Sequence, residues 1–209
     1  DPSAQDSRNA RYDVAVFYVL EKQLDKALAI YREAFAELAD PFFGLWVAIL
    51  AEELQDAKTR DAALARIRTD SPTVVRKEIG RVRKELIELA GLIERDLAQA
   101  GQGQIDLKAV DKLRATIQDP YELGYFDLFL ARYLQTHGKR DEAVRYWKER
   151  IAASYALSYC RTQASAALRE LGLTAESSKT TPEKAPPGDA KAAPEATKQG
   201  ERTGDKERG

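Results

Sequence analysis

The sequence is nearly devoid of the residues with which proteins most often bind metals or carry out nucleophilic chemistry. Its 209 residues include one His, one Cys and no Met. A single Cys excludes an intrachain disulfide, and a zinc site would have to draw almost all of its ligands from carboxylates. We therefore expect no metal, no cofactor and no catalytic residues. An enzyme that works through carboxylates alone is a remaining alternative, although no motif singles out a pair among the 34 acidic residues.

The lone His and the lone Cys are each expected to have a structural role. His137 immediately precedes Gly138 at a predicted helix end, where the helix dipole favours a cation that can bond the last carbonyls. Cys160 lies among apolar residues of the last predicted helix, where a free Cys usually packs as a small hydrophobe. The Gly-Gln-Gly fragment at 101–103 lacks the third glycine of a dinucleotide-binding fingerprint, so no phosphate-binding loop is predicted.

An excess of positive charge and long apolar runs are also missing. The 33 basic and 34 acidic residues give a formal net charge of −1, and because nucleic-acid binding is driven by summed positive charge, we expect no nucleic-acid partner. The longest apolar runs, 14–20 and 42–51, are shorter than the roughly 20 residues that span a bilayer, so no membrane span is predicted. A start at Asp1 rather than Met fits removal of an export signal, which favours an exported or cell-envelope protein. A cut made by an experimenter would leave the same start, so the compartment stays open.

The last part of the chain has no means of building a core. Residues 174–209 contain no Ile, Leu, Val, Phe, Tyr, Trp or Cys, and their acidic and basic residues are interspersed. Such a segment cannot bury enough apolar surface to offset its ordering entropy. We predict a helical domain over residues 1–173, which is long enough for one sizeable core, and a disordered polyampholyte tail over residues 174–209.

The apolar residues of the first 173 positions recur with a spacing near 3.6, and no segment alternates as a half-buried strand does, which predicts an all-α fold. Three predicted helix starts combine a capping residue with a proline, whose missing N–H would be unpaired at the first helical position. These starts are Asp40-Pro41, Ser71-Pro72 and Asp119-Pro120, and the glycines expected at helix ends are Gly138 and Gly172. The predicted helices span residues 8–21, 24–38, 42–56, 60–69, 72–100, 107–118, 120–136, 140–152 and 155–171.

One pattern of small and aromatic residues occurs twice. A small residue is followed by an aromatic residue four positions later and by a second small residue seven positions later. The first copy is Ala27, Tyr31 and Ala34, and the second is Ala143, Trp147 and Arg150, where Arg replaces the second small residue. Alanines let paired antiparallel helices approach closely, and the aromatic side chain fills the space between successive pairs. Tyr31 and Trp147 are therefore predicted to be interior wedges.

This pattern resembles the tetratricopeptide repeat. The first-helix positions of the family match Val14, Ala15 and Tyr18 in one unit and Leu130, Ala131 and Leu134 in the other. A degenerate middle unit over residues 42–68 contains Leu50, Ala51, Ala63 and Ile67. The two clear units are not separated by a whole number of family periods of roughly 34 residues. The resemblance therefore implies an irregular solenoid of antiparallel helix pairs, with residues 155–171 as its capping helix.

The resemblance also implies a function. In such arrays the first helices of successive pairs line a groove that accepts a segment of another protein. We accordingly expect a non-catalytic scaffold that binds a protein or peptide partner of unknown identity. The residues expected to line this groove are Tyr12, Asp13, Val16, Glu52, Gln55, Tyr125, Phe129, Arg132 and Gln135.

The predicted helix over residues 72–100 interrupts the repeat pattern as an insertion. Its apolar residues alternate in steps of four and three, the spacing of a seam along a partner helix. The seam consists of Val75, Ile79, Val82, Leu86, Leu89 and Ile93. We favour packing of this seam on the chain's own helices, because stripes of this kind usually face a core. The alternative is a structural homo-oligomer, such as a homodimer, assembled through the long helix.

Overall fold

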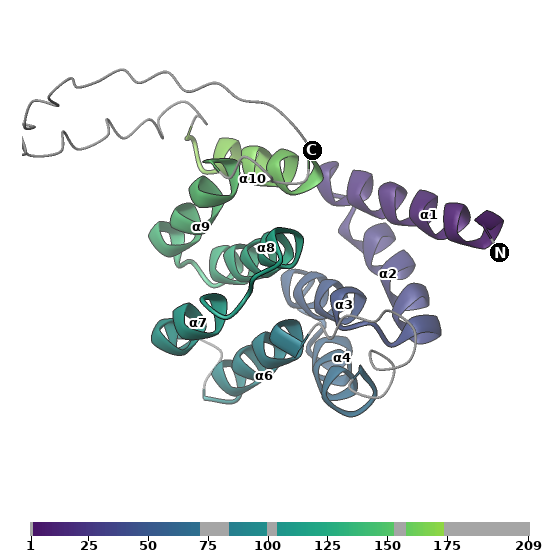
Figure 1. Cartoon of the computed structure of the whole chain (residues 1–209), viewed down its shortest axis with the longest axis horizontal. Helices are drawn as coiled ribbons and strands as arrows, with labels where there is room; N and C mark the ends of the chain where they lie inside the picture. The colour runs from purple at the N-terminus through teal and green to yellow at the C-terminus, as the bar shows by residue number, and fades with distance from the viewer. Residues whose placement is uncertain (1, 72–83, 100–103, 153–157, 174–209) are drawn as a thin grey trace, which may run out of the picture. The chain divides into compact units, whose positions relative to one another are not determined.

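The structure, a computed structural model, describes residues 2–71, 84–99, 104–152 and 158–173, and all regular elements within these ranges are α-helices (Figure 1). The all-α prediction is confirmed. The helices are α1 (Pro2–Leu20), α2 (Leu24–Leu38), α3 (Pro41–Glu53), α4 (Ala57–Thr69), α6 (Lys84–Ala98), α7 (Leu107–Arg114), α8 (Pro120–Thr136), α9 (Arg140–Ala152) and α10 (Ser158–Glu170). The predicted tail over residues 174–209 and the first part of the predicted long helix, 72–83, lie outside the described residues.

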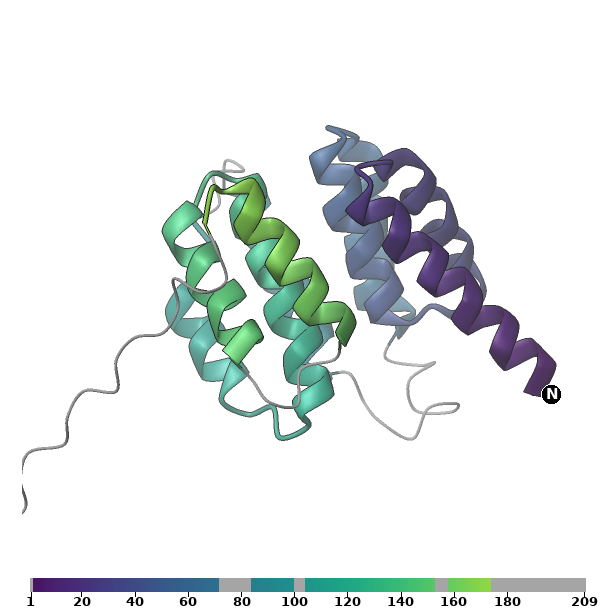
Figure 2. The same ribbon diagram turned by 90° about the horizontal axis from the view of Figure 1, so that it is seen from above.

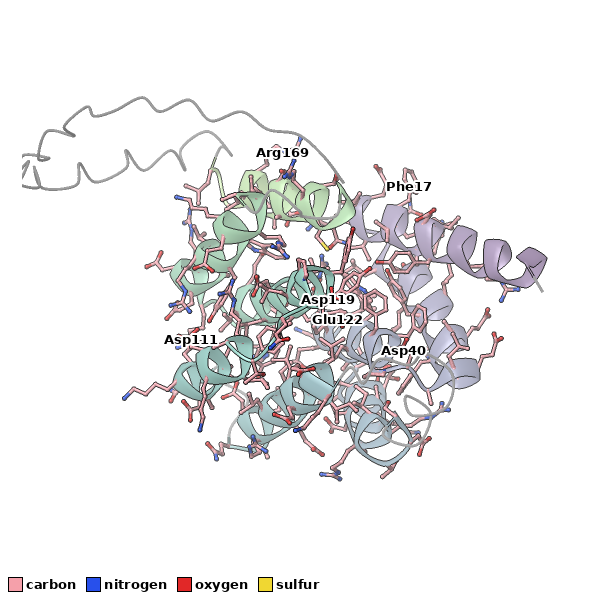
Figure 3. All side chains as sticks on the ribbon, viewed as in Figure 1. Phe17, Asp40, Asp111, Asp119, Glu122 and Arg169 are labelled. Atoms are coloured by element: carbon pink, nitrogen blue, oxygen red, sulfur yellow. The ribbon has the colours of Figure 1, made fainter. Side chains whose placement is uncertain are left out.

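Both predicted Asp-Pro starts cap their helices as expected, and Figure 3 labels both aspartates. The Oδ1 atom of Asp40 accepts a hydrogen bond from the backbone N–H of Phe42 at 2.9 Å at the start of α3. The Oδ1 atom of Asp119 accepts one from the backbone N–H of Tyr121 at 2.8 Å at the start of α8. Ser71 uses its hydroxyl differently, because Oγ donates to the carbonyl of Ala39 at 2.6 Å.

Both predicted glycine ends are also confirmed. Gly138 and Gly172 have φ values of +71° and +73°, in the left-handed region that glycine enters without strain. Several predicted boundaries were wrong. Helix α1 begins at Pro2 rather than residue 8, and helix α7 ends at Arg114 rather than residue 118. Helix α3 ends at Glu53 rather than residue 56, because Gln55 adopts a left-handed conformation with φ of +60°. Helix α4 begins at Ala57 rather than residue 60, because Asp56 caps it by accepting a hydrogen bond from Thr59 N–H at 3.0 Å.

Helices that are consecutive in the chain pack against each other in two sets, α1 to α4 and α8 to α10, and α6 and α7 lie between these sets in the chain (Figure 2). Helix α3 lies at the centre, in contact with α2, α4, α6 and α8. The residues from Gly44 to Ala51 are all buried, because neighbours cover this apolar helix on every side. Among the described helices, none is both long and apolar enough to cross a membrane.

The two predicted aromatic wedges are both buried. The Tyr31 ring stacks on the Trp46 ring, with centroids 5.1 Å apart and planes 4° from parallel. Trp147 Nε1 donates a hydrogen bond to Gln135 Oε1 at 3.1 Å and so joins α9 to α8. The Tyr31 contact joins α2 to the first helix of the next predicted pair, as the repeated pattern predicted. The Trp147 hydrogen bond joins the two helices of one predicted pair, so a position of Trp147 between successive pairs stays a prediction.

The described part of the long-helix seam faces the interior of the chain. Leu86, Leu89 and Ile93 are buried on α6, which packs against α3, α4, α7 and α8. The interpretation that we favoured, packing on the chain's own helices, holds for this part. An assembly through these three side chains would require them to leave the core.

Candidate functional site

Three of the nine residues predicted for the groove, one on α1 and two on α8, pack around one ring, that of Phe42 on α3. The Tyr12 and Tyr125 centroids lie 5.4 Å and 4.7 Å from the Phe42 centroid, and both tyrosines are partly buried. Phe129 is fully buried, with its centroid 5.4 Å from that of Phe42 and 5.3 Å from that of Trp46. The expectation that Phe129 lines an open groove was therefore wrong, because α3 and α8 pack directly on each other at this level.

The next group of predicted groove residues lies near helix ends or on open surface. Asp13 and Gln55 are exposed, and Val16 is half-buried. Glu52 forms an ion pair with Arg60 that joins α3 to α4. These positions do not converge on one cavity with Tyr12 and Tyr125.

His137 is the C-terminal cap residue of α8, and its backbone N–H donates to the Tyr133 carbonyl at 3.2 Å. Its ring centroid lies 4.5 Å from that of Tyr133, and its Nε2 atom lies 3.3 Å from Glu52 Oε1. Beside it, the hydroxyl of Tyr133 donates to Asp96 Oδ2 at 2.5 Å. Burial is the main cause that raises the pKa of the Tyr133 hydroxyl, and the Asp96 carboxylate raises it further. The phenol therefore keeps its proton, and its hydrogen bond to Asp96 joins α8 to α6.

The remaining two predicted groove residues, Arg132 and Gln135, line a cavity of about 300 Å³ that we call the junction pocket. It lies where the C-terminal parts of α1, α3, α8 and α10 meet the start of α2. Its walls combine apolar side chains from α1, α2 and α10 with polar side chains from α3, α8 and α10. The lining residues are Val19, Leu20, Lys22, Leu24, Glu53, Arg132, Gln135, Thr136, Gln163, Ala166, Ala167 and Glu170.

Two ion pairs neutralise the charges of the junction pocket. Arg132 donates to both oxygens of Glu53, from Nε at 2.6 Å and from Nη2 at 2.9 Å, and its guanidinium carbon lies 5.7 Å from the Trp46 ring centroid. Lys22 Nζ lies 2.6 Å from Glu170 Oε2. Because several helices end here, their carbonyl ends favour cations, and Lys22 and Arg132 supply them.

Gln163 is a member of this pocket that the sequence analysis missed. Its side chain on α10 is only 3% exposed, and neither amide atom has a hydrogen-bond partner among the residues that the structure describes. An unpaired buried amide is unfavourable, which makes such a residue stand out. The sequence does carry a signal for it, since Gln163 falls on the same helix face as Cys160 and Ala167.

Cys160 is fully buried, and burial raises the pKa of its thiol to about 12. Within the described ranges, no group of three or more His, Cys, Asp or Glu side chains is arranged to hold a metal ion. Comparisons with protein-family models, with curated proteins and with solved structures gave no match for this chain.

Proposed function

We propose that this chain is a non-catalytic helical scaffold that binds a segment of another protein in the junction pocket. The observation that supports the proposal is the shared location of Arg132 and Gln135, two of the residues predicted for a binding groove, beside an apolar wall in one cavity. Ligand sites typically join an apolar lining to a few polar groups that fix orientation. The junction pocket has this composition.

The size of the cavity favours one anchoring side chain rather than a whole folded partner. At about 300 Å³ it is at the lower end of the volumes of ligand sites. A protein segment that inserts one residue would fill it, and the flanking residues of the segment would lie across the ends of α1 and α10. This arrangement moves the expected binding surface from the middle of the first helices, where Phe129 fills the space, toward their C-terminal ends.

The test is a pocket-filling substitution compared with a matched one elsewhere. Peptides would be selected from a random displayed library on the full chain, and their affinities measured for Ala166→Phe and Ala36→Phe. Ala166 lines the junction pocket, whereas Ala36 lines a separate open groove between α2 and α4. We expect Ala166→Phe to weaken binding at least tenfold and Ala36→Phe to leave it unchanged, with matching circular-dichroism spectra and melting temperatures.

Two outcomes would contradict the proposal. In one, the library yields no peptide that binds the unmodified chain above background. In the other, the selected peptides bind Ala166→Phe as well as the parent but lose affinity for Ala36→Phe, which would place the binding surface between α2 and α4.

A further inference from the structure

We infer that the junction pocket selects a segment whose anchoring residue carries an uncharged carboxamide, namely Asn or Gln. This inference rests on the proposed function and specifies the chemistry of the partner. It is drawn from two features of the pocket, the balance of its charges and the unpaired amide of Gln163.

The charges of the pocket leave little net attraction for a charged ligand. Arg132 and Glu53 satisfy each other through two hydrogen bonds, and their side chains are only 14% and 17% exposed. Lys22 pairs with Glu170 at the open edge of the pocket, where the side chains are 56% and 38% exposed and solvent screens their charges. A carboxylate ligand would have to compete with Glu53 for the guanidinium, and an ammonium ligand would have to compete with Arg132 for the carboxylate. Either exchange leaves one former partner in a low-dielectric site without its counter-charge, which is unfavourable.

The unused hydrogen-bonding capacity of the pocket is that of an amide. Gln163 has a donor group and an acceptor atom, and both are unpaired among the described residues. A second carboxamide is the complement of such a group, because each of the two amides can donate one hydrogen bond and accept one. Both would then be paired in the complex, whereas a carboxylate, an ammonium group or an alkyl chain could satisfy only one half of Gln163 or neither.

The position of Gln163 adds a requirement for movement. Its amide atoms are covered in the free protein, although the residue lines the cavity. A bound carboxamide therefore has to draw the Gln163 amide toward the cavity by rotation of its side chain. Gln135 fixes the neighbouring wall, because its Oε1 already accepts a hydrogen bond from Trp147. Its NH₂ group remains as a further donor toward the carbonyl of a ligand.

The experiment uses four small probes on the full chain. N-acetyl-glutamine N-methylamide is compared with the glutamate, lysine and leucine analogues, all of which share the same two backbone amides. Binding is followed by NMR shifts of the glutamine side-chain amides. We expect the glutamine probe to bind at least fivefold more tightly than the other three and to shift the Gln163 signals most.

Gln163→Leu provides the decisive variant, and Gln118→Leu, at an exposed position, is its matched control. The first change should abolish the preference for the glutamine probe and raise the melting temperature, because it replaces an unpaired buried amide by an apolar side chain of similar size. The control should alter neither. Tighter binding of the lysine or glutamate probe, or equal binding of all four, would overturn the inference, and so would a lower melting temperature of Gln163→Leu.

Failure of this inference can be told apart from failure of the proposed function. If library peptides are sensitive to Ala166→Phe but lack Asn and Gln and bind Gln163→Leu normally, the pocket binds segments without selecting a carboxamide. If no library peptide is sensitive to Ala166→Phe, the proposed function itself is wrong.

Discussion

The central helices of the two sets, α3 and α8, begin with the same sequence features. Different kinds of side chain pack against them. Each central helix starts with Asp-Pro and has a glycine within its first two turns, Gly44 in α3 and Gly124 in α8. A Cβ atom at Gly44 would lie 2.5 Å from the Cγ1 atom of Ile67, and one at Gly124 would lie 2.6 Å from the Nη1 atom of Arg150. The missing side chain of each glycine thus lets a neighbouring side chain lie close to the helix backbone. This neighbour is aliphatic in one set and a guanidinium group in the other.

The second set, α8 to α10, therefore contains charged side chains in its interior. Arg150, which stands where the repeated pattern has a small residue, is 1% exposed. Nearby, the buried Asp127 carboxylate accepts hydrogen bonds from Arg114 Nε at 2.7 Å and Nη2 at 3.0 Å. Burial raises the pKa of Asp127 although Arg114 opposes the shift. Two helices that begin alike can therefore pack against an aliphatic side chain in one set and against buried charged side chains in the other, provided that the buried charges are paired.

The largest expected effects come from the two aromatic wedges, one in each set. Tyr31→Ala and Trp147→Ala should each lower the free energy of unfolding by about 3 to 5 kcal/mol, because each removes a buried aromatic ring. Urea unfolding monitored by circular dichroism measures both. An unchanged unfolding midpoint for either variant would show that its ring is not part of the core.

Conservative changes at the same two positions should affect the free energy of unfolding differently in the two sets. Tyr31→Phe removes a buried hydroxyl that has no hydrogen-bond partner among the described residues, so stability should stay the same or rise. Trp147→Phe removes the hydrogen bond to Gln135 and should be destabilising. A larger loss of stability for Tyr31→Phe than for Trp147→Phe would mean that the hydroxyl of Tyr31 contributes more to stability than the indole N–H of Trp147.

Intermediate effects are expected at the two glycines. Gly44→Ala should lower the free energy of unfolding by about 1 to 3 kcal/mol, because the new methyl group meets Ile67 and Phe35 in a closed core. Gly124→Ala should cost less, since the atom that it meets is the end of an Arg side chain. Thermal and urea unfolding of both variants would give the ranking.

A double-mutant cycle provides the control for this ranking. In an Arg150→Ala background, Gly124→Ala should lose most of its effect, whereas Gly44→Ala should keep its full effect. If Gly124→Ala is equally destabilising with and without Arg150, the close approach of the guanidinium is not the cause.

The smallest effects concern how the helices end. The second set ends α8 and α10 with the left-handed glycines Gly138 and Gly172, whereas α2 ends with Ala39 at φ of +51°. Because a left-handed conformation disfavours a residue with a Cβ atom, Ala39→Gly should raise the free energy of unfolding by about 0.5 to 1 kcal/mol. Gly138→Ala should lower it by about 1 kcal/mol. Urea unfolding measures both changes. A lower free energy of unfolding for Ala39→Gly, or a higher one for Gly138→Ala, would contradict the comparison.

Local features of the fold could be predicted from the sequence, and contacts between distant segments could not. Asp40-Pro41 and Gly138 act through neighbouring backbone groups, so their roles follow from adjacent residues. The burial of Phe129 depends on how α8 meets α3, and no spacing within α8 shows which face α3 covers. The end of α3 was misplaced because a left-handed Gln55 breaks the usual preference for glycine.

The candidate site illustrates the same limit. Arg132 and Gln135 could be found from the periodicity of α8, but their neighbours in the junction pocket come from α1, α2, α3 and α10. Glu53 was not among the residues predicted for the groove, and nothing near it in the sequence points to Arg132. Gln163 could be placed on an apolar helix face, yet its lack of a partner is a property of the assembled core.

The central position of α3 also has a consequence for biosynthesis. An apolar helix that is covered partly by α8 cannot be fully shielded until α8 has been made. Arg132 follows its partner Glu53 by 79 residues, so at 5–20 residues per second a ribosome needs about 4 to 16 s to add it. During that interval Phe42 and Trp46 lack the side chain of Phe129. The nascent chain therefore exposes the apolar helix α3 for seconds, which is the period in which chaperones would have to protect it from aggregation.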